Sequence, residues 1–269
     1  MPSDKKITNI LKNLNQFSYS YEVTPNVNWD KLDILSVNTN FVCVTWHARN
    51  YDFKSFDIAP VKLAKHLRDK GKTVCLHLTC DLMKKNYLNG LLRHLQEHGI
   101  CNLFIILGES YDGKGTDFKS SQELIEHIRK QAGDYFCIGV AGFPNCPENV
   151  IAQLKTKVEA GVDFLITKGV FDTTSFKTFI EKCAKIGITI PIVPGIFYYN
   201  SEKELTYLAK EYGISVPKEV IAETKKSPVN YQKKFISQIY NTDPKIKQIH
   251  FFTIDKLDPV NKFVTELKL

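Results

Sequence analysis

Apolar and polar residues alternate in short runs along this chain, and each run is followed by a stretch with a helical period. The run Thr73–Cys80 shows the pattern well, because Leu76 and Leu78 fall on one face of a strand. His77 and Thr79 fall on the opposite face. A strand that packs on one side and carries hydrogen-bonding side chains on the other suits a closed parallel barrel, where helices cover the outside and the site lies in the lumen.

Eight runs of this kind predict eight strands. They cover Phe17–Val23, Asn40–Trp46, Thr73–Cys80, Asn102–Leu107, Tyr135–Ala141, Asp163–Lys168, Ile190–Val193 and Ile249–Ile254. Helical stripes lie between the runs, for example Leu88, Leu91 and Leu95 on one helix face. At the N-terminus, Ser3–Asn15 predicts a short amphipathic helix that plugs the bottom of the barrel. Three helices precede the last strand, at Glu202–Tyr212, Pro217–Lys225 and Tyr231–Tyr240.

The order of these elements predicts the fold class. Eight strands that alternate with helices over about 250 residues are the signature of a (β/α)8 barrel, the TIM barrel. The sequence therefore predicts an α/β fold with a single domain over residues 1–269, in which residues 1–16 form the N-terminal helix and residues 17–269 the barrel. A doubly wound open sheet is the alternative, because alternation of strands and helices does not by itself prove that the sheet closes.

Composition and charge narrow the class of function. With 43% hydrophobic and 24% charged residues the chain can bury a full core, and no apolar run approaches the ~20 residues that span a bilayer. We therefore expect a cytoplasmic protein with no membrane partner. The net charge of +7 includes a lysine patch around Lys225 and Lys233 that lacks interleaved aromatics, so we expect a solvated face and no nucleic-acid partner. The excess of positive charge would equally suit a protein that binds an anionic small molecule.

Cysteine and glycine patterns exclude several kinds of site. Seven cysteines are scattered without a Cys-x-x-Cys pair, which argues against zinc and against a disulfide framework. We expect reduced, mostly buried thiols and no metal site. No Gly-x-Gly-x-x-Gly and no complete Gly-x4-Gly-Lys-Ser/Thr phosphate loop occurs, so neither a Rossmann domain nor a P-loop NTPase is supported.

Polar side chains gather where the predicted strands end. In a TIM barrel the active site lies at the carboxyl ends of the strands, so residues far apart in the sequence meet at one mouth. The residues at these ends are Glu22, Thr45, His77, Thr79, Gly108, Glu109, Ala141, Lys168, Gly195, Thr253 and Asp255. Together they would place carboxylates, a lysine, an imidazole and hydroxyls around one opening. Taken alone, His77 could equally be a core histidine bonded to a neighbouring carbonyl.

A series of motifs in a fixed order carries a family resemblance. The motifs are Tyr21–Pro25, Phe41–Thr45, His77–Cys80, Ile138–Pro144, Glu159–Gly161, Ile166–Thr167, Phe171–Asp172, Pro191–Ile196 and His250–Thr253. From about Tyr19 to Ile254 the chain resembles methylenetetrahydrofolate reductase, a flavoprotein barrel. The resemblance implies an enzyme in which NADH or NADPH reduces bound FAD, and the flavin reduces 5,10-methylenetetrahydrofolate to 5-methyltetrahydrofolate.

The resemblance also implies roles for particular residues. By position Glu22 is the catalytic acid, and a carboxyl held in a lumen with little water can keep its proton near neutral pH. The implied flavin contacts are Thr45, His77, Gly108, Glu109, Ala141 and Lys157, the last of these near the diphosphate. The implied folate contacts are Glu22, Glu109, Lys168 and Glu204. Barrels of this family associate, so a homo-oligomer is also an expectation of the resemblance.

Several positions depart from the family's pattern. The Arg-Gly-Asp after the fourth strand is Leu107-Gly108-Glu109 here, the glutamine that ends the sixth strand is Lys168, and the stacking phenylalanine aligns with Leu208. These departures keep a second hypothesis open, in which the barrel has lost catalysis and FAD and binds another ligand or a protein partner at the same mouth. Because the chain stops just after the barrel, we expect no regulatory domain and no control by adenosylmethionine.

Lys168 carries a further hypothesis. An ammonium that reaches across the mouth to Glu22 would stabilise the carboxylate and lower its pKa, which would remove the proton donor. A lysine at the end of a barrel strand could instead form a Schiff base with a carbonyl substrate, which would require a depressed pKa.

Overall fold

Eight parallel strands close on themselves in chain order, so the sheet is a complete barrel. The computed structural model describes residues 5–36, 39–243 and 246–267. The strands are β1 (Ser18–Val23), β2 (Thr39–Val44), β3 (Val74–Thr79), β4 (Asn102–Ile106), β5 (Cys137–Gly142), β6 (Phe164–Gly169), β7 (Ile192–Phe197) and β8 (Gln248–Phe252). β1 pairs with β2 on one side and with β8 on the other, where Glu22 lies opposite Phe252. This closure excludes the open doubly wound sheet and confirms the predicted α/β TIM barrel.

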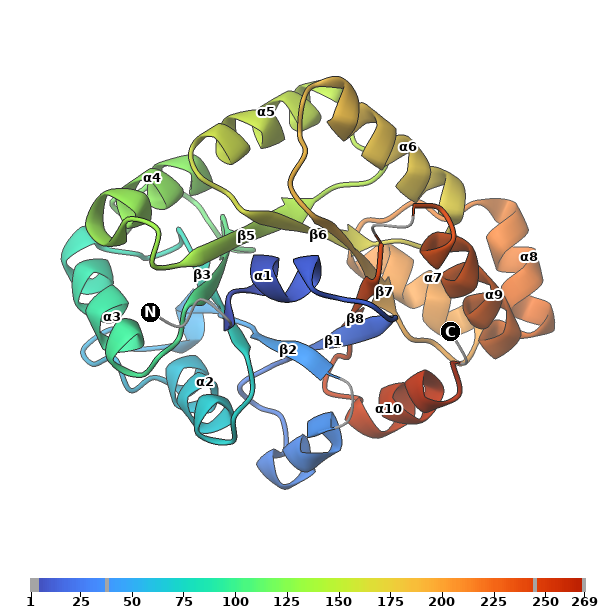
Figure 1. The fold of residues 1–269 in the computed structure, drawn as a ribbon, viewed down its shortest axis with the longest axis horizontal. Helices are drawn as coiled ribbons and strands as arrows, with labels where there is room; N and C mark the ends of the chain where they lie inside the picture. The colour runs from blue at the N-terminus through green and yellow to red at the C-terminus, as the bar shows by residue number, and fades with distance from the viewer. Residues whose placement is uncertain (1–4, 37–38, 244–245, 268–269) are drawn as a thin grey trace.

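Figure 1 shows helices in a ring around the strands, with α1 lying over one end of the barrel inside that ring. The helices are α1 (Ile7–Lys12), α2 (Ala59–Asp69), α3 (Lys85–Glu97), α4 (Ser121–Ala132), α5 (Glu148–Glu159), α6 (Thr173–Lys185), α7 (Glu202–Glu211), α8 (Lys218–Lys226), α9 (Pro228–Tyr240) and α10 (Leu257–Thr265). The leucine stripe predicted on α3 is buried against the barrel. Over the described residues, no helix combines the length and the apolar character that crossing a membrane requires.

Side chains fill the barrel lumen. The cluster inside it consists of Ile7, Phe41, Cys43, Cys75, Phe104, Cys137, Phe164, Ile166 and Val193. Gly139 in β5 makes room for this packing, because a Cβ there would stand 2.4 Å from the tip of the Phe164 ring. The lumen is therefore closed below, and only the residues at the carboxyl ends of the strands can reach a bound molecule.

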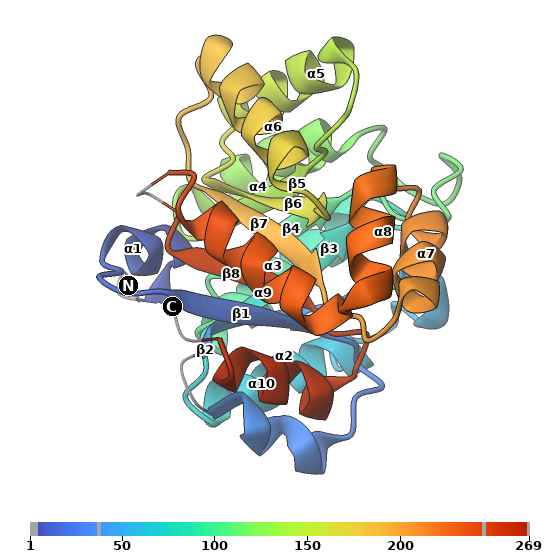
Figure 2. The same cartoon turned by 90° about the vertical axis from the view of Figure 1, so that its right-hand side faces the viewer.

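The short helix α1 closes the amino-terminal end of the barrel, opposite α7 and α8 in Figure 2. Ile7 is fully buried in the lumen cluster, and its backbone N–H donates to Asn102 Oδ1 at 2.9 Å. The predicted plug is therefore present. Its helix is shorter than the predicted Ser3–Asn15, of which Ser3 and Asp4 lie outside the described residues.

The end of strand β7 differs from its predicted end more than that of any other described strand. The strand continues through Pro194 and Gly195 to Phe197, whereas the prediction ended it before Pro194. The pairing with β6 shifts register opposite this point, and the Gly195 N–H donates at 2.9 Å to Thr167 Oγ1. Because the ladder is already interrupted here, a proline without an N–H is tolerated inside the strand. Gly195 consequently lies within β7 and not at its end.

A 3₁₀ helix after β1 and a group of helices before β8 complete the outer layer of the barrel. A 3₁₀ helix, η2 (Trp29–Ser36), follows β1 and buries Leu32 and Leu35, and the sequence pattern did not predict it. The predicted extra helices before the last strand are present as α7, α8 and α9. Figure 2 shows α7 and α8 beside the end toward which the strands point, so these helices flank the mouth of the barrel.

Candidate active site

Glu22 and His77, far apart in the sequence, meet at the carboxyl end of the barrel. Glu22 lies near the end of β1 and His77 lies in β3, and Glu22 Oε2 is 3.9 Å from His77 Nε2. Both side chains are largely buried, with 21% of Glu22 and 8% of His77 exposed. Barrel closure therefore brings these two predicted residues to one opening.

Burial keeps both of these groups uncharged at neutral pH. Desolvation, with smaller contributions from the carboxylates of Asp255 and Glu109, raises the pKa of Glu22 to about 8. Desolvation, with a smaller contribution from His47, lowers the pKa of His77 to about 3. The pair is thus a neutral carboxylic acid that faces a neutral imidazole, and not an ion pair. A carboxyl in this state can donate a proton at neutral pH.

Lys168 does not form the predicted ion pair with Glu22. In β6 Lys168 is two residues beyond Ile166 and four beyond Phe164, so it lies on the same face of the strand as these two lumen residues. Its side chain is partly buried. Among the described residues no ion pair involves its ammonium. The raised pKa of Glu22 is the opposite of the lowered value that such a pair would produce. The hypothesis that Lys168 removes the proton donor is therefore wrong.

Two buried polar atoms on neighbouring strands lack partners within the described structure. Thr45 Oγ1, just after β2, and His77 Nε2, in β3, have no hydrogen-bond partner. Buried polar atoms are normally paired, so these two atoms mark a place where a bound molecule could accept or donate hydrogen bonds. Ala141 in β5 adds a short side chain next to the lumen cluster, which lets a planar group approach the backbone. These three residues therefore offer two unpaired polar atoms and a short side chain toward the carboxyl end of the barrel.

Gly108 and Glu109 lie in the loop after β4, and an arginine holds this loop in place. Gly108 has a φ of +111°, and a Cβ there would stand 2.8 Å from Asp81 Cβ, so both conformation and space favour glycine. Arg49 donates to the Asp81 carboxylate at 2.9 and 3.1 Å and to the Ser110 carbonyl at 2.6 Å. The Glu109 side chain is 78% exposed, which places it on the rim of the mouth.

Two other predicted contacts lie outside this group. Lys157 is in the last turn of α5, where burial lowers its pKa, and no described hydrogen bond or ion pair joins its side chain to the mouth. Glu204 is in the first turn of α7, where its carboxylate accepts a hydrogen bond from the Asn200 N–H at 2.9 Å and one from Lys256. The Glu204 carboxylate is therefore engaged at the helix start, and its role in binding folate stays a prediction.

Tyr212 is a mouth residue that the sequence reasoning missed. Its ring centroid lies 4.6 Å from that of Phe197 in β7. Desolvation raises its pKa, with further contributions from the nearby Glu22 and Glu109 carboxylates. Strand ends guided the prediction, and Tyr212 follows a helix. Its spacing of four residues from Leu208 is the signal that would have placed it on the same helix face.

The family that this barrel belongs to follows from a comparison of its whole length. The family model for methylenetetrahydrofolate reductase matches residues 6–268. The chain belongs to the methylenetetrahydrofolate reductase family. The resemblance inferred from the sequence motifs is thereby confirmed, and the match includes every residue assigned to the mouth.

Individual relatives agree with this assignment. The chain is 27% identical to methylenetetrahydrofolate reductase 1 of Schizosaccharomyces pombe, over 94% of this chain and 46% of the relative. It is 30% identical to a probable methylenetetrahydrofolate reductase (NADH) of Oryza sativa, over 76% of this chain and 39% of the relative. The 5,10-methylenetetrahydrofolate reductase of Escherichia coli is 26% identical, over 86% of this chain and 81% of the relative. The chain thus spans less than half of these two eukaryotic relatives.

Solved structures of other families share the fold. A 2,3-dimethylmalate lyase superposes with a TM-score of 0.55 at 12% identity, over 96% of this chain and 84% of the other. An oxaloacetate acetylhydrolase gives a TM-score of 0.57 at 10% identity, over 97% of this chain and 84% of the other. At this level of identity the similarity shows the fold alone.

Proposed function

We propose that this chain is a flavin-dependent reductase that uses NADH or NADPH to convert 5,10-methylenetetrahydrofolate to 5-methyltetrahydrofolate. Family membership supports the reaction class, and one observation carries the proposal for this chain. That observation is the burial of the Glu22 carboxyl at the mouth, 3.9 Å from His77, because this burial raises the pKa of the carboxyl to about 8. The reduction requires a proton at a ring nitrogen of the folate when the methylene bridge opens, and Glu22 is the group placed to give it.

The state of Glu22 suits this role. With a pKa of about 8, the carboxyl holds its proton in most copies of the protein at pH 7. His77 does not take this proton, because its pKa is lowered to about 3. The Thr253 hydroxyl donates to the Glu22 backbone carbonyl, which fixes the end of β1 against β8. The proton therefore stays on Glu22 until the carbon–nitrogen bond of the methylene bridge begins to break and the leaving nitrogen gains negative charge.

Three residues would hold the flavin. When bound, FAD supplies the hydride transfer between the nicotinamide and the folate. Thr45 Oγ1 and His77 Nε2 are the unpaired buried atoms that would bind its polar edge, and Ala141 leaves room for its ring system. We further propose Glu109 and Lys168 as a carboxylate and an ammonium at the mouth for the polar edge of the folate, and Lys157 for the FAD diphosphate.

Flavin uptake and its redox cycle test the proposal. Purified protein is incubated with FAD, desalted and examined for flavin absorbance without oxygen, first alone and then after addition of NADH or NADPH. We expect the protein to retain flavin. NADH or NADPH should reduce it, so that its visible absorbance is bleached, and methylenetetrahydrofolate should then re-oxidise it, so that the absorbance returns. Protein that stays colourless after incubation with FAD would overturn the proposal and favour the barrel that binds a different ligand or partner.

The variant Glu22→Gln sharpens this test. It keeps the size of the side chain but removes the acidic proton. We expect it to retain flavin and to be bleached by the nicotinamide as the wild type is, because neither event needs this proton. The rate at which methylenetetrahydrofolate re-oxidises the reduced flavin should fall by a factor of about 10² to 10⁴, the usual contribution of a general acid. Re-oxidation of the flavin at the wild-type rate would show that Glu22 is not the proton donor.

A further inference from the structure

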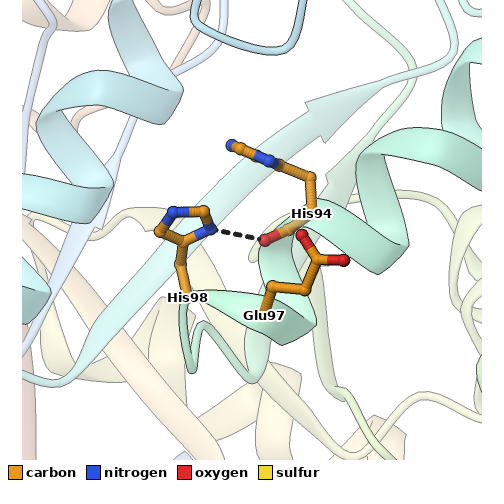
Figure 3. A group of neighbouring side chains, drawn as sticks. All are labelled: His94, Glu97 and His98. Carbon is orange, nitrogen blue, oxygen red and sulfur yellow. Dashed lines mark hydrogen bonds between the residues drawn. The ribbon is translucent and has the colours of Figure 1, made fainter.

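The last turn of α3 gathers two imidazoles and a carboxylate on the outside of the barrel (Figure 3). His94 and His98 are four residues apart and Glu97 is three residues from His94, so all three side chains leave one side of the helix. One ligand atom from each residue lies within 4.8 Å of the other two. The centroids of the two imidazole rings are 4.4 Å apart. The order His-x-x-Glu-His is one that zinc peptidases use on a helix.

The hydrogen bonding of the two rings leaves nitrogen lone pairs available. His98 Nδ1 lies 2.8 Å from the His94 backbone carbonyl. A carbonyl can only accept, so Nδ1 carries the proton and Nε2 of His98 keeps its lone pair. Donation of one ring N–H to a carbonyl is also how metal-binding histidines are usually oriented. In addition, His94 Nε2 is buried and has no hydrogen-bond partner in the described structure.

The end of the helix adds to the attraction for a cation. α3 ends at Glu97 and His98 follows as its C-terminal cap, so the cluster lies at the negative end of the helix dipole. The exposed Glu97 contributes a full negative charge and can change rotamer without repacking. Zinc binds imidazole nitrogen at about 2.0–2.1 Å, so the three side chains, whose ligand atoms are now up to 4.8 Å apart, must change rotamer to share one ion.

We propose that His94, Glu97 and His98 form a binding site for a divalent transition-metal ion, with Zn²⁺ as the representative ion. Two imidazoles and one carboxylate are a borderline ligand set that suits Zn²⁺, Ni²⁺ and Cu²⁺ better than Mg²⁺ or Ca²⁺. The expectation of no metal site rested on the cysteine spacing and did not consider this histidine pair. No fourth His, Cys, Asp or Glu in the described residues joins the group, so water would complete the coordination.

The position of the site separates it from the proposed reductase chemistry. After His98 the chain enters β4 at Asn102, so the cluster lies at the amino-terminal end of the barrel, opposite the mouth that holds Glu22. The His94 ring lies 5.5 Å from that of Phe56, which also packs on Gly90 in the same helix. A bound ion would tie together the last turn of α3 and stabilise the native state, because the unfolded chain does not hold the three ligands together.

Metal titration of untagged, full-length protein tests the proposal. Isothermal titration calorimetry with ZnCl2 measures stoichiometry and Kd, and the visible absorption of added Co²⁺ reports nitrogen coordination. We expect one saturable Zn²⁺ per chain. The variants His98→Gln and Glu97→Gln should each raise Kd by at least about tenfold, since each removes one ligand. His66→Gln is the matched control, because this histidine lies on α2 against Trp29 and should leave Kd unchanged.

The outcomes separate this proposal from its alternatives. Circular dichroism of each variant shows that the fold is kept, and flavin uptake is measured in parallel because it does not depend on α3. Absence of a saturable Zn²⁺ signal would overturn the proposal. So would an equal loss of affinity in His66→Gln, or an unchanged Kd in both His98→Gln and Glu97→Gln, because each result would show scattered surface binding.

Discussion

The substitution Glu22→Gln should make the free energy of unfolding less sensitive to pH. In the native state the pKa of Glu22 is raised from 4.5 to about 8, chiefly by desolvation. A carboxyl whose pKa is higher in the folded than in the unfolded state binds its proton more tightly when folded. Its contribution to stability is therefore full below pH 4.5 and is lost as the pH rises through 8. Glutamine does not titrate, so the variant lacks this loss.

The size of the effect follows from the same shift. A change from 4.5 to about 8 corresponds to about 5 kcal/mol at most. The carboxyl keeps 21% of its surface exposed, and solvent lowers the cost of ionising it. We therefore expect the stability of the variant relative to the wild type to improve by about 2–4 kcal/mol between about pH 4 and about pH 9.

Urea denaturation of both proteins at these two pH values measures the difference. Other titrating groups contribute equally to both proteins and cancel when the two are subtracted. Glu211→Gln, at an exposed position on α7, is the matched control and should track the wild type. A constant difference between Glu22→Gln and the wild type across this range would refute a protonated Glu22 in the native state.

Three further predictions concern the barrel around the site. Burial lowers the pKa of His250 to about 3, so the contribution of this residue to stability is present above pH 6.5 and is lost as the pH falls toward 3. In His250→Asn the urea concentration at the unfolding midpoint should therefore fall less steeply as the pH is lowered through this range. Arg49→Leu should lower the free energy of unfolding, measured by urea denaturation, by about 1–3 kcal/mol, because it leaves the Asp81 carboxylate, 4% exposed, without its charged partner. Gly195→Ala should lower Tm markedly, because the new Cβ would stand 2.2 Å from the Thr167 carbonyl oxygen, and an unchanged Tm would contradict this packing.

The elements that could be read from the sequence are those with a strong local period. The alternation in β3 and the leucine stripe of α3 each fix which side of an element is buried, and the count and order of elements predict a barrel, whose closure the structure then shows. The end of β7 was not readable. Whether Pro194 ends a strand depends on the register shift in the neighbouring β6, which is a property of two strands and not of one segment.

The meeting of Glu22 and His77 was predictable from the sequence, but the electrostatics of this pair were not. Position at a strand end was enough to bring Glu22 and His77 together. The ion pair between Lys168 and Glu22 was wrong, because charge pairing depends on distances across the mouth that alternation does not encode. Tyr212 and the Arg49–Asp81 pair were missed for the same reason, since they reach the mouth from a helix end and from loops.

The protonation state of one side chain tests the account most directly. Carbon-detected NMR of the folded protein follows the Glu22 carboxyl across a pH titration, with Glu22→Gln to assign its signal. We predict an apparent pKa of about 8. A value near the ordinary 4.5 would contradict the account, because the mouth would then hold a carboxylate with no proton to give at neutral pH.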